Sequence, residues 1–206
     1  MSRGRLVAAA LLVVAAAVTV ARVVVRGDDQ PREPLVVGVE LKGVTGASET
    51  ATGFVVEPGR VITVAHVLDP DRELLVRVSG SVRRARLLRQ DRRYDLALIA
   101  VAGLAAREGR RAADGRSRLL VRRAGHTAKL PARLRRRVRA TVRGPDWGPY
   151  RRPALELAAH VRSGDSGAPF VDGHGRVAGV LFARTSDGRG TAYALDASAL
   201  TRFLSR

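Results

Sequence analysis

The sequence predicts an all-β fold behind an N-terminal apolar segment, with one short helix at the C-terminus. Two observations support this prediction. From Leu35 onward, short apolar runs that alternate with a period of two, or that are rich in β-branched residues, lie between turns of Gly, Pro and Asp. Only residues 196–205 show the i, i+3, i+4 apolar spacing of a helix, with Asp196 or Ser198 as the N-cap. Many short strands before one terminal helix are typical of a β-barrel or of a pair of packed sheets.

The expected strands fall into two halves. Turn motifs such as EPGR (57–60) and DGHGR (172–176) separate neighbouring strands. Residues 103–116 are rich in Gly, Ala and Arg and lack strand alternation, so we interpret them as a linker between a first half of about 35–102 and a second half of about 117–195. The individual strands are expected at 35–41, 52–58, 60–66, 73–79, 82–89, 95–101, 117–123, 132–142, 154–160, 168–172, 176–184 and 190–195.

The chain is strongly basic, and almost all of its cations are arginines. Its 206 residues contain 37 Lys and Arg against 19 Asp and Glu, and only Lys42 and Lys129 are lysines. Such a balance indicates nucleic acid, anionic lipid or an acidic envelope polymer as a neighbour, or a compositional bias of the genome, since Arg, Ala and Gly dominate and asparagine is absent. The chain has no cysteine, which excludes a disulfide-stapled fold and thiol chemistry.

The most basic stretch is ARLRRRVRATVR at 132–143. Read as a strand, it places arginines on a solvated face, as a barrel strand does. No aromatic residues interleave with the arginines to stack on bases, and the whole chain has 4 Phe, 1 Trp and 3 Tyr. We therefore expect no specific nucleic-acid binding, and we expect the arginines to lie beside anionic lipid or a wall polymer.

Residues 1–34 form the N-terminal signal or anchor segment and its linker. The apolar run from Leu6 to Val25 is about as long as the ~20 residues that cross a bilayer, and Arg22 within it can snorkel to the headgroups. Two interpretations remain: an uncleaved single-pass anchor with the domain 35–206 outside the cytoplasm, or a signal peptide cut after a site such as Thr19-Val20-Ala21 to give a secreted protein. We favour the anchor in the cell membrane.

The stretch VRSGDSGAPF (161–170) crowds small residues around Ser166. Such a composition is typical of a surface turn, but it also suits a loop that holds one hydroxyl in place. Serine is a nucleophile only when a base takes its proton. Of the four histidines, His66 stands out because it ends an apolar strand in VITVAHVL, where it can be either a structural residue or a catalyst. Asp95 opens the strand DLALIAV, either as a turn residue or as the acid that orients His66.

Together these three motifs are far more specific than each alone. TVAHV, DLAL and GDSGAPF resemble the catalytic motifs of the chymotrypsin/trypsin-fold serine proteases, in the order His, Asp, Ser, over about Leu35 to the C-terminus. That order differs from those of subtilisins and α/β-hydrolases. The resemblance implies two six-stranded antiparallel β-barrels with the catalytic cleft between them. It also implies a serine endopeptidase that hydrolyses peptide bonds through an acyl-enzyme.

The resemblance assigns a role to each motif residue. Ser166 attacks the substrate carbonyl, His66 moves the proton and Asp95 orients His66. The backbone N–H groups of Gly164 and Ser166 form the oxyanion hole. Asp165 matches an acid that pairs with a newly cut N-terminus in zymogen-activated relatives. No activation site is recognisable here, so Arg162 or another arginine takes that place, or Asp165 has no such partner.

The substrate pocket is the least readable part of the sequence. By resemblance its base lies near His160, with walls from Phe182 to Arg184 and from Gly190 to Tyr193. His160 is neither the acid of proteases that cleave after Arg or Lys nor an apolar floor. The pattern indicates no residue type for cleavage.

The overall likeness is bacterial. The segment GRVAGVLFARTSDGRGTAYALDASALTRFL (175–204) is similar to HtrA-like and MarP-type membrane-tethered envelope proteases, and we expect no PDZ domain after the terminal helix. We expect protein or peptide substrates, no cofactor and no metal, since no two histidines have ligand spacing. The alternative is a catalytically silent domain of this fold that binds peptide or an anionic envelope component.

Overall fold

The computed structural model describes residues 32–206 except 43–47, 106–114, 144–148 and 187. The expected apolar segment at 6–25 and most of the expected linker therefore lie outside the described residues. Within the described residues, no helix is both long and apolar enough to cross a membrane.

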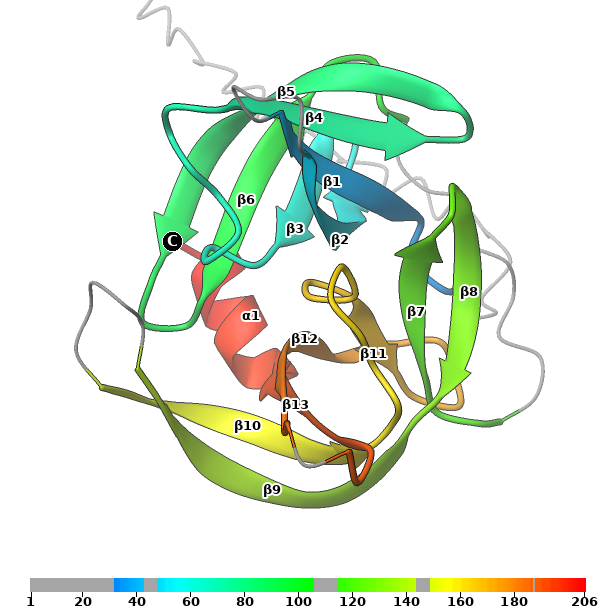
Figure 1. Cartoon of the computed structure of the whole chain (residues 1–206), viewed down its shortest axis with the longest axis vertical. Helices are drawn as coiled ribbons and strands as arrows, with labels where there is room; N and C mark the ends of the chain where they lie inside the picture. The colour runs from blue at the N-terminus through cyan, green and yellow to red at the C-terminus, as the bar shows by residue number, and fades with distance from the viewer. Residues whose placement is uncertain (1–31, 43–47, 106–114, 144–148, 187) are drawn as a thin grey trace, which may run out of the picture.

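The first half is a closed antiparallel barrel of six strands, in the order β1-β2-β3-β6-β5-β4 (Figure 1). Its interior is filled mainly by β-branched side chains, which favour strands because their restricted χ1 angles suit the pleated backbone. Two-residue turns join β2 to β3 and β4 to β5, and Ser79 and Gly80, in the second of these turns, both have the positive φ of a primed hairpin turn. The strands are β1 (Val36–Lys42), β2 (Ser48–Glu57), β3 (Arg60–Thr63), β4 (Glu73–Val78), β5 (Ser81–Asp91) and β6 (Leu96–Val101).

The second half is a seven-stranded antiparallel sheet in the order β8-β7-β11-β12-β13-β10-β9, followed by the helix α1 (Ala197–Leu204). The all-β prediction with one C-terminal helix is confirmed, but this half has one strand more than the six expected. The additional strand is β8, which pairs with β7. The strands are β7 (Arg118–Arg123), β8 (His126–Pro131), β9 (Arg133–Val142), β10 (Tyr150–Ala158), β11 (Pro169–Val171), β12 (Val177–Arg184) and β13 (Thr191–Asp196).

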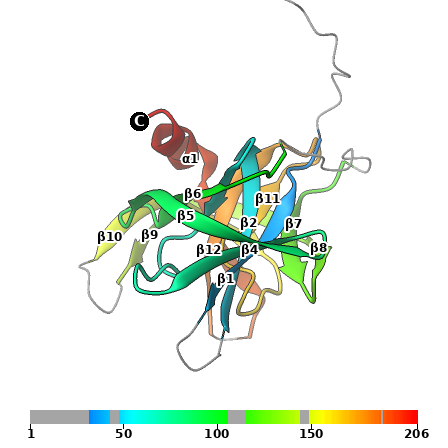
Figure 2. The same cartoon turned by 90° about the horizontal axis from the view of Figure 1, so that it is seen from above.

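The two halves share a buried core. One apolar cluster contains Phe54 and Ile62 from the barrel together with Val180 and Phe203 from the second half. The side chain of Asp196 caps α1 by accepting a hydrogen bond from Ser198 N. The apolar face of α1 packs against β12 and β13, and Figure 2 shows the helix on the side of β5 and β6. The core therefore holds the barrel and the sheet in one arrangement.

The segment before β1 is also fastened to the second half. Glu33 is only 4% exposed. Its carboxylate lies 2.8 Å from Arg118 Nε on β7 and 2.8 Å from Lys129 Nζ on β8. The chain thus makes an ionic contact with the second sheet before it enters the first barrel.

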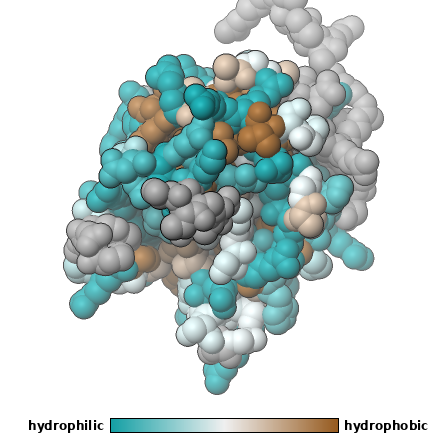
Figure 3. Space-filling view, turned by 45° about the horizontal axis from the view of Figure 1, so that its top comes forward, coloured by the Kyte–Doolittle hydropathy of each residue, from teal (hydrophilic) through white to brown (hydrophobic). Residues whose placement is uncertain are grey.

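The surface is hydrophilic and rich in arginine. Figure 3 shows a face where hydrophilic residues predominate and hydrophobic residues form only small, separate patches. On the exposed strand β9, Arg136 pairs with Glu156 at 2.8 Å and Arg137 pairs with Asp196. Part of the most basic stretch is thus engaged within the molecule.

Candidate active site

His66 and Asp95 lie in the turns next to two adjacent strands. β3 ends at Thr63 and β6 begins at Leu96, so both strands are shorter than expected and neither candidate residue is inside a strand. Asp95 has a φ of +59°, in the left-handed region that Asp tolerates better than most residues. Its carbonyl accepts a hydrogen bond from Ala65 N at 3.2 Å. This backbone link sets the Asp95 turn against the segment that carries His66.

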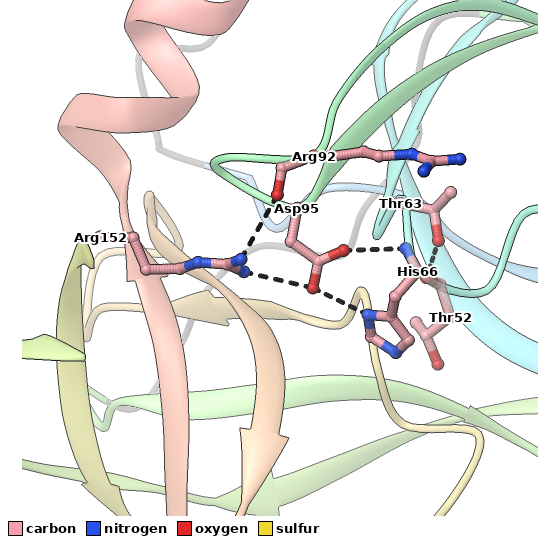
Figure 4. A network of polar contacts seen from close by, with 6 residues as sticks. All are labelled: Thr52, Thr63, His66, Arg92, Asp95 and Arg152. Atoms are coloured by element: carbon pink, nitrogen blue, oxygen red, sulfur yellow. Dashed lines mark hydrogen bonds and ion pairs between the residues drawn. The ribbon is translucent and has the colours of Figure 1, made fainter. Parts of the chain in front are cut away.

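The Asp95 carboxylate holds His66 by two hydrogen bonds. Oδ1 accepts from the His66 backbone N–H at 2.8 Å, and Oδ2 lies 2.8 Å from His66 Nδ1 (Figure 4). Asp95 is 4% exposed, whereas the His66 side chain is 36% exposed. Since an ionised carboxylate can only accept hydrogen bonds, a neutral imidazole in this pair carries its proton on Nδ1 and its lone pair on Nε2. The geometry therefore prepares Nε2 to act as a base.

Ser166 follows a tight turn. Asp165 N donates to Arg162 O at 3.2 Å, and Gly164, the third residue of this turn, has a φ of +90°. These are the features of a type II turn, which requires a residue free to adopt positive φ at the third position. The backbone geometry next to Ser166 therefore requires glycine at position 164, in addition to its expected role in the oxyanion hole.

Backbone contacts seat the Ser166 loop on the first barrel. Thr52 on β2 donates from its N–H to Ser166 O at 2.8 Å and from its hydroxyl to Gly164 O at 3.0 Å. Thr63 at the end of β3 donates to Thr52 O at 2.9 Å. A Cβ on Gly167, which has a φ of +86°, would lie 2.0 Å from Thr52 O, so only glycine fits there.

The structure thus seats the Ser166 loop on β2, which pairs with β3, the strand that leads into His66. Within the described residues, the His66 side chain hydrogen-bonds to Asp95 alone, and Ser166 makes its hydrogen bond to Thr52 through its backbone carbonyl. The three candidate catalytic residues come from both halves of the fold.

Asp165 has partners that the sequence left open. It is 1% exposed. Arg123, at the end of β7, donates two hydrogen bonds to it, from Nε to Oδ1 at 2.9 Å and from Nη2 to Oδ2 at 2.5 Å. Arg162 contributes its backbone N–H to Oδ2 at 2.8 Å, and not its guanidinium. The hydrogen bond to Asp165 raises the pKa of Arg123 above the ordinary value for arginine. An internal cation therefore fixes the turn that carries Ser166.

The expected pocket residues are found in different surroundings. His160 is exposed, and Gly190 lies so close to its ring that a Cβ there would be 2.7 Å from Cε1. Arg184 is exposed at the end of β12, and Tyr193 is half-buried on β13. Phe182 is 6% exposed, with its ring centroid 5.1 Å from Cζ of Arg152. Of this set, the structure brings His160 and Gly190 together and directs Phe182 toward the interior.

Four residues that hold the site were not named from the sequence: Thr52, Thr63, Arg123 and Arg152. Arg152 on β10 is fully buried, and its Nη1 lies 3.4 Å from Asp95 Oδ2. The only sequence signal for the two arginines is their place in strands beside apolar residues that face the core. Among the described residues, no three His, Cys, Asp or Glu side chains are grouped as a metal site requires.

Comparisons with known proteins agree with this geometry. The family described as "Trypsin-like peptidase domain" matches residues 51–180, more than half of the chain. The chain is 34% identical over 157 residues to the serine proteases MT3772 and Rv3671c, from two strains of Mycobacterium tuberculosis, and this match covers 71% of the chain but only 39% of each relative.

Solved structures give the same result. The crystal structure of the active form of the M. tuberculosis Rv3671c protease superposes with a TM-score of 0.72 at 29% identity, covering 84% of this chain and 81% of that one. The inactive form of the same protease gives a TM-score of 0.67 at 29% identity, covering 84% and 89%. The fold, the family match and the identity to these serine proteases together establish that the chain belongs to the trypsin-like serine peptidases.

Proposed function

We propose that this chain is a serine endopeptidase in which Ser166 is the nucleophile, His66 the general base and Asp95 the acid that orients it. The observation that carries the proposal is the pair of 2.8 Å contacts from Asp95 to the backbone and to Nδ1 of His66. They leave Nε2 to take a proton, and the Ser166 loop rests on β2, the neighbour of the strand that leads into His66. The matched relatives are named serine proteases, and this chain spans about two fifths of their length.

The chemistry follows from this geometry. Ser166 Oγ attacks the carbonyl carbon of the scissile peptide bond while its proton passes to His66 Nε2. The carbonyl oxygen becomes an oxyanion, which accepts hydrogen bonds from the backbone N–H groups of Gly164 and Ser166. Collapse of this intermediate breaks the C–N bond as His66 returns the proton to the leaving amine. Water then attacks the acyl-enzyme by the same steps and releases the acid product.

A fluorophosphonate probe tests the nucleophile and the base. We expect the probe to label the wild-type protein and not Ser166→Ala, because only an activated serine reacts with it. His66→Ala should slow labelling strongly because Oγ then lacks its proton acceptor. The matched controls are Ser198→Ala and His174→Ala, which remove an exposed serine and an exposed histidine elsewhere. If correctly folded wild-type protein is not labelled, the endopeptidase proposal fails and the silent peptide-binding domain replaces it.

We also propose a substrate pocket with His160 at its base and Gly190 against the His160 ring. Arg184 and Tyr193, which flank Gly190 in the sequence, would form the walls of this pocket. Replacing His160 with aspartate places an acid at the expected base of the pocket. The preferred residue before the cleaved bond should then shift toward Arg or Lys, which profiling with a peptide library measures. An unchanged preference would remove His160 from the pocket.

We propose that residues 6–25 hold the protein in the cell membrane, with the peptidase domain outside the cytoplasm and protein or peptide substrates in the envelope. The length and apolar character of this stretch support the proposal. Mass spectrometry of the intact N-terminus distinguishes an anchor, which keeps residues 1–21, from a signal peptide, which loses them. Membrane fractions washed with carbonate should retain the anchored protein.

A further inference from the structure

Arg152 is a buried cation that the proposed reaction does not use. It lies on β10 in the second sheet, whereas Asp95 belongs to the first barrel, and its side chain is fully buried. Burial lowers the pKa of Arg152 below the ordinary arginine value, and the charge of Asp95 opposes this shift. Taking an arginine charge out of water is costly unless an anion compensates it. Asp95 provides that compensation.

The guanidinium contacts the same oxygen that holds His66. Arg152 Nη1 lies 3.4 Å from Asp95 Oδ2, which also lies 2.8 Å from His66 Nδ1. Nη2 donates to the carbonyl of Arg92 at 3.4 Å. Figure 4 shows Arg152 reaching Asp95 from the side opposite to His66. One carboxylate oxygen therefore lies between a permanent cation and an imidazole.

The surroundings keep the guanidinium in place. The Phe182 ring lies 5.1 Å from Cζ of Arg152, within cation–π distance. Asp91, at the end of β5, is the other acid that favours the charged form of Arg152. The side chain of Arg92 extends away from the Asp95 carboxylate in Figure 4. Among the described residues, the acids that favour the charged form of Arg152 are thus Asp95 and Asp91.

We propose that Arg152 is a positioning residue for catalysis, which acts through Asp95 to hold the carboxylate toward His66 and to moderate its negative charge. This proposal rests on the proposed endopeptidase function. It has two separable consequences. The contact limits rotation of the carboxylate, which keeps Oδ2 on His66 Nδ1. The positive charge also makes protonation of His66 less favourable, because the guanidinium offsets part of the attraction of Asp95 for an imidazolium.

The test is Arg152→Met in the full chain, with kcat, KM and the pH profile of kcat/KM measured on a peptide substrate. We expect kcat to fall roughly 10- to 100-fold, as for a catalytic group that is misplaced by about 1 Å, with KM little changed. We expect the acid limb of the profile to move to higher pH, because the guanidinium no longer offsets part of the attraction of Asp95 for an imidazolium. Arg152→Lys keeps the charge but not the planar fork, so its acid limb should stay near that of the wild type.

Arg118→Met is the matched control, since it also removes a buried arginine from an ion pair, with Glu33, on a different strand. It should lower the melting temperature without moving the pH profile. If Arg152→Met does not fold, the double variant with Asp95→Asn replaces the buried ion pair with neutral groups, a change that proteins often tolerate. In the Asp95→Asn background, replacing Arg152 should change kcat less than twofold, because the charge through which it acts is gone.

The proposal is overturned if folded Arg152→Met keeps the wild-type profile and kcat, or if the replacement costs the same factor with and without the Asp95 carboxylate. These outcomes differ from a failure of the endopeptidase proposal. In that case the wild-type protein itself does not react with a fluorophosphonate.

Discussion

Replacing Arg123 with methionine should loosen the turn that carries Ser166, because it removes the guanidinium that grips Asp165. Asp165 is 1% exposed and would keep only the backbone N–H of Arg162 as a partner for its side chain among the contacts described. Removing one partner of a buried ion pair costs about 3–5 kcal/mol. Since the Arg123 side chain is 23% exposed, water can partly replace it, so we expect the lower end, about 3 kcal/mol.

The same change should lower activity more than stability alone explains. If the turn no longer aligns the Gly164 N–H, one oxyanion donor is lost, which costs about 10²–10³ in kcat. Urea unfolding gives the free energy of unfolding, and peptide hydrolysis well below the melting temperature gives kcat/KM. Arg136→Met, which removes an exposed arginine from its pair with Glu156, serves as the control and should leave both nearly unchanged. The reasoning is refuted if folded Arg123→Met matches this control in both measurements.

Three further substitutions test the packing around the site. Gly167→Ala places a Cβ 2.0 Å from Thr52 O at a φ of +86°. We therefore expect a lower melting temperature and a loss of kcat/KM of about 100-fold or more, as for a displaced catalytic group. Near wild-type turnover would contradict this. Thr52→Val removes the hydroxyl that donates to Gly164 O. This loss should cost about 1–3 kcal/mol of stability and lower kcat in a steady-state assay. A stability equal to that of the wild type by urea unfolding would contradict this prediction. Phe203→Ala empties a 2% exposed core position, so the free energy of unfolding should fall by about 3–5 kcal/mol. The folded fraction should still react with a fluorophosphonate. Loss of that reactivity would contradict a purely structural role.

The fold was largely predictable because its strands obey local rules. Apolar alternation and β-branched runs anticipated every described strand but β8. That strand was missed because its turn is Ala124-Gly125, whereas the strong hairpin signals are Asn-Gly and Asp-Gly. Both residues nevertheless have positive φ, of 47° and 77°, and the register pairs Arg123 with His126 across the turn. The positive φ of Ala124 is imposed by the paired strands, which no local sequence signal indicates.

The site divides in a similar way. His66, Asp95 and Ser166 stand in short motifs whose chemistry is readable from the sequence. The groups that hold these three residues in place cannot be identified from the sequence, because they make contacts between residues far apart in the chain. Arg123 meets Asp165 across 42 positions, and Arg152 reaches Asp95 from the other half of the fold. In a chain with 37 Lys and Arg, composition cannot show which arginines point inward.

The ion pairs of Glu33 determine how a pull on the N-terminus enters the domain. Because Glu33 contacts Arg118 and Lys129, tension on residue 32 is resisted by β7 and β8 before it reaches β1. Part of a force on the chain before Glu33 is thus carried by the second sheet, which also contains Arg123. A force that would otherwise separate β1 from the barrel first has to break the two ionic contacts of Glu33.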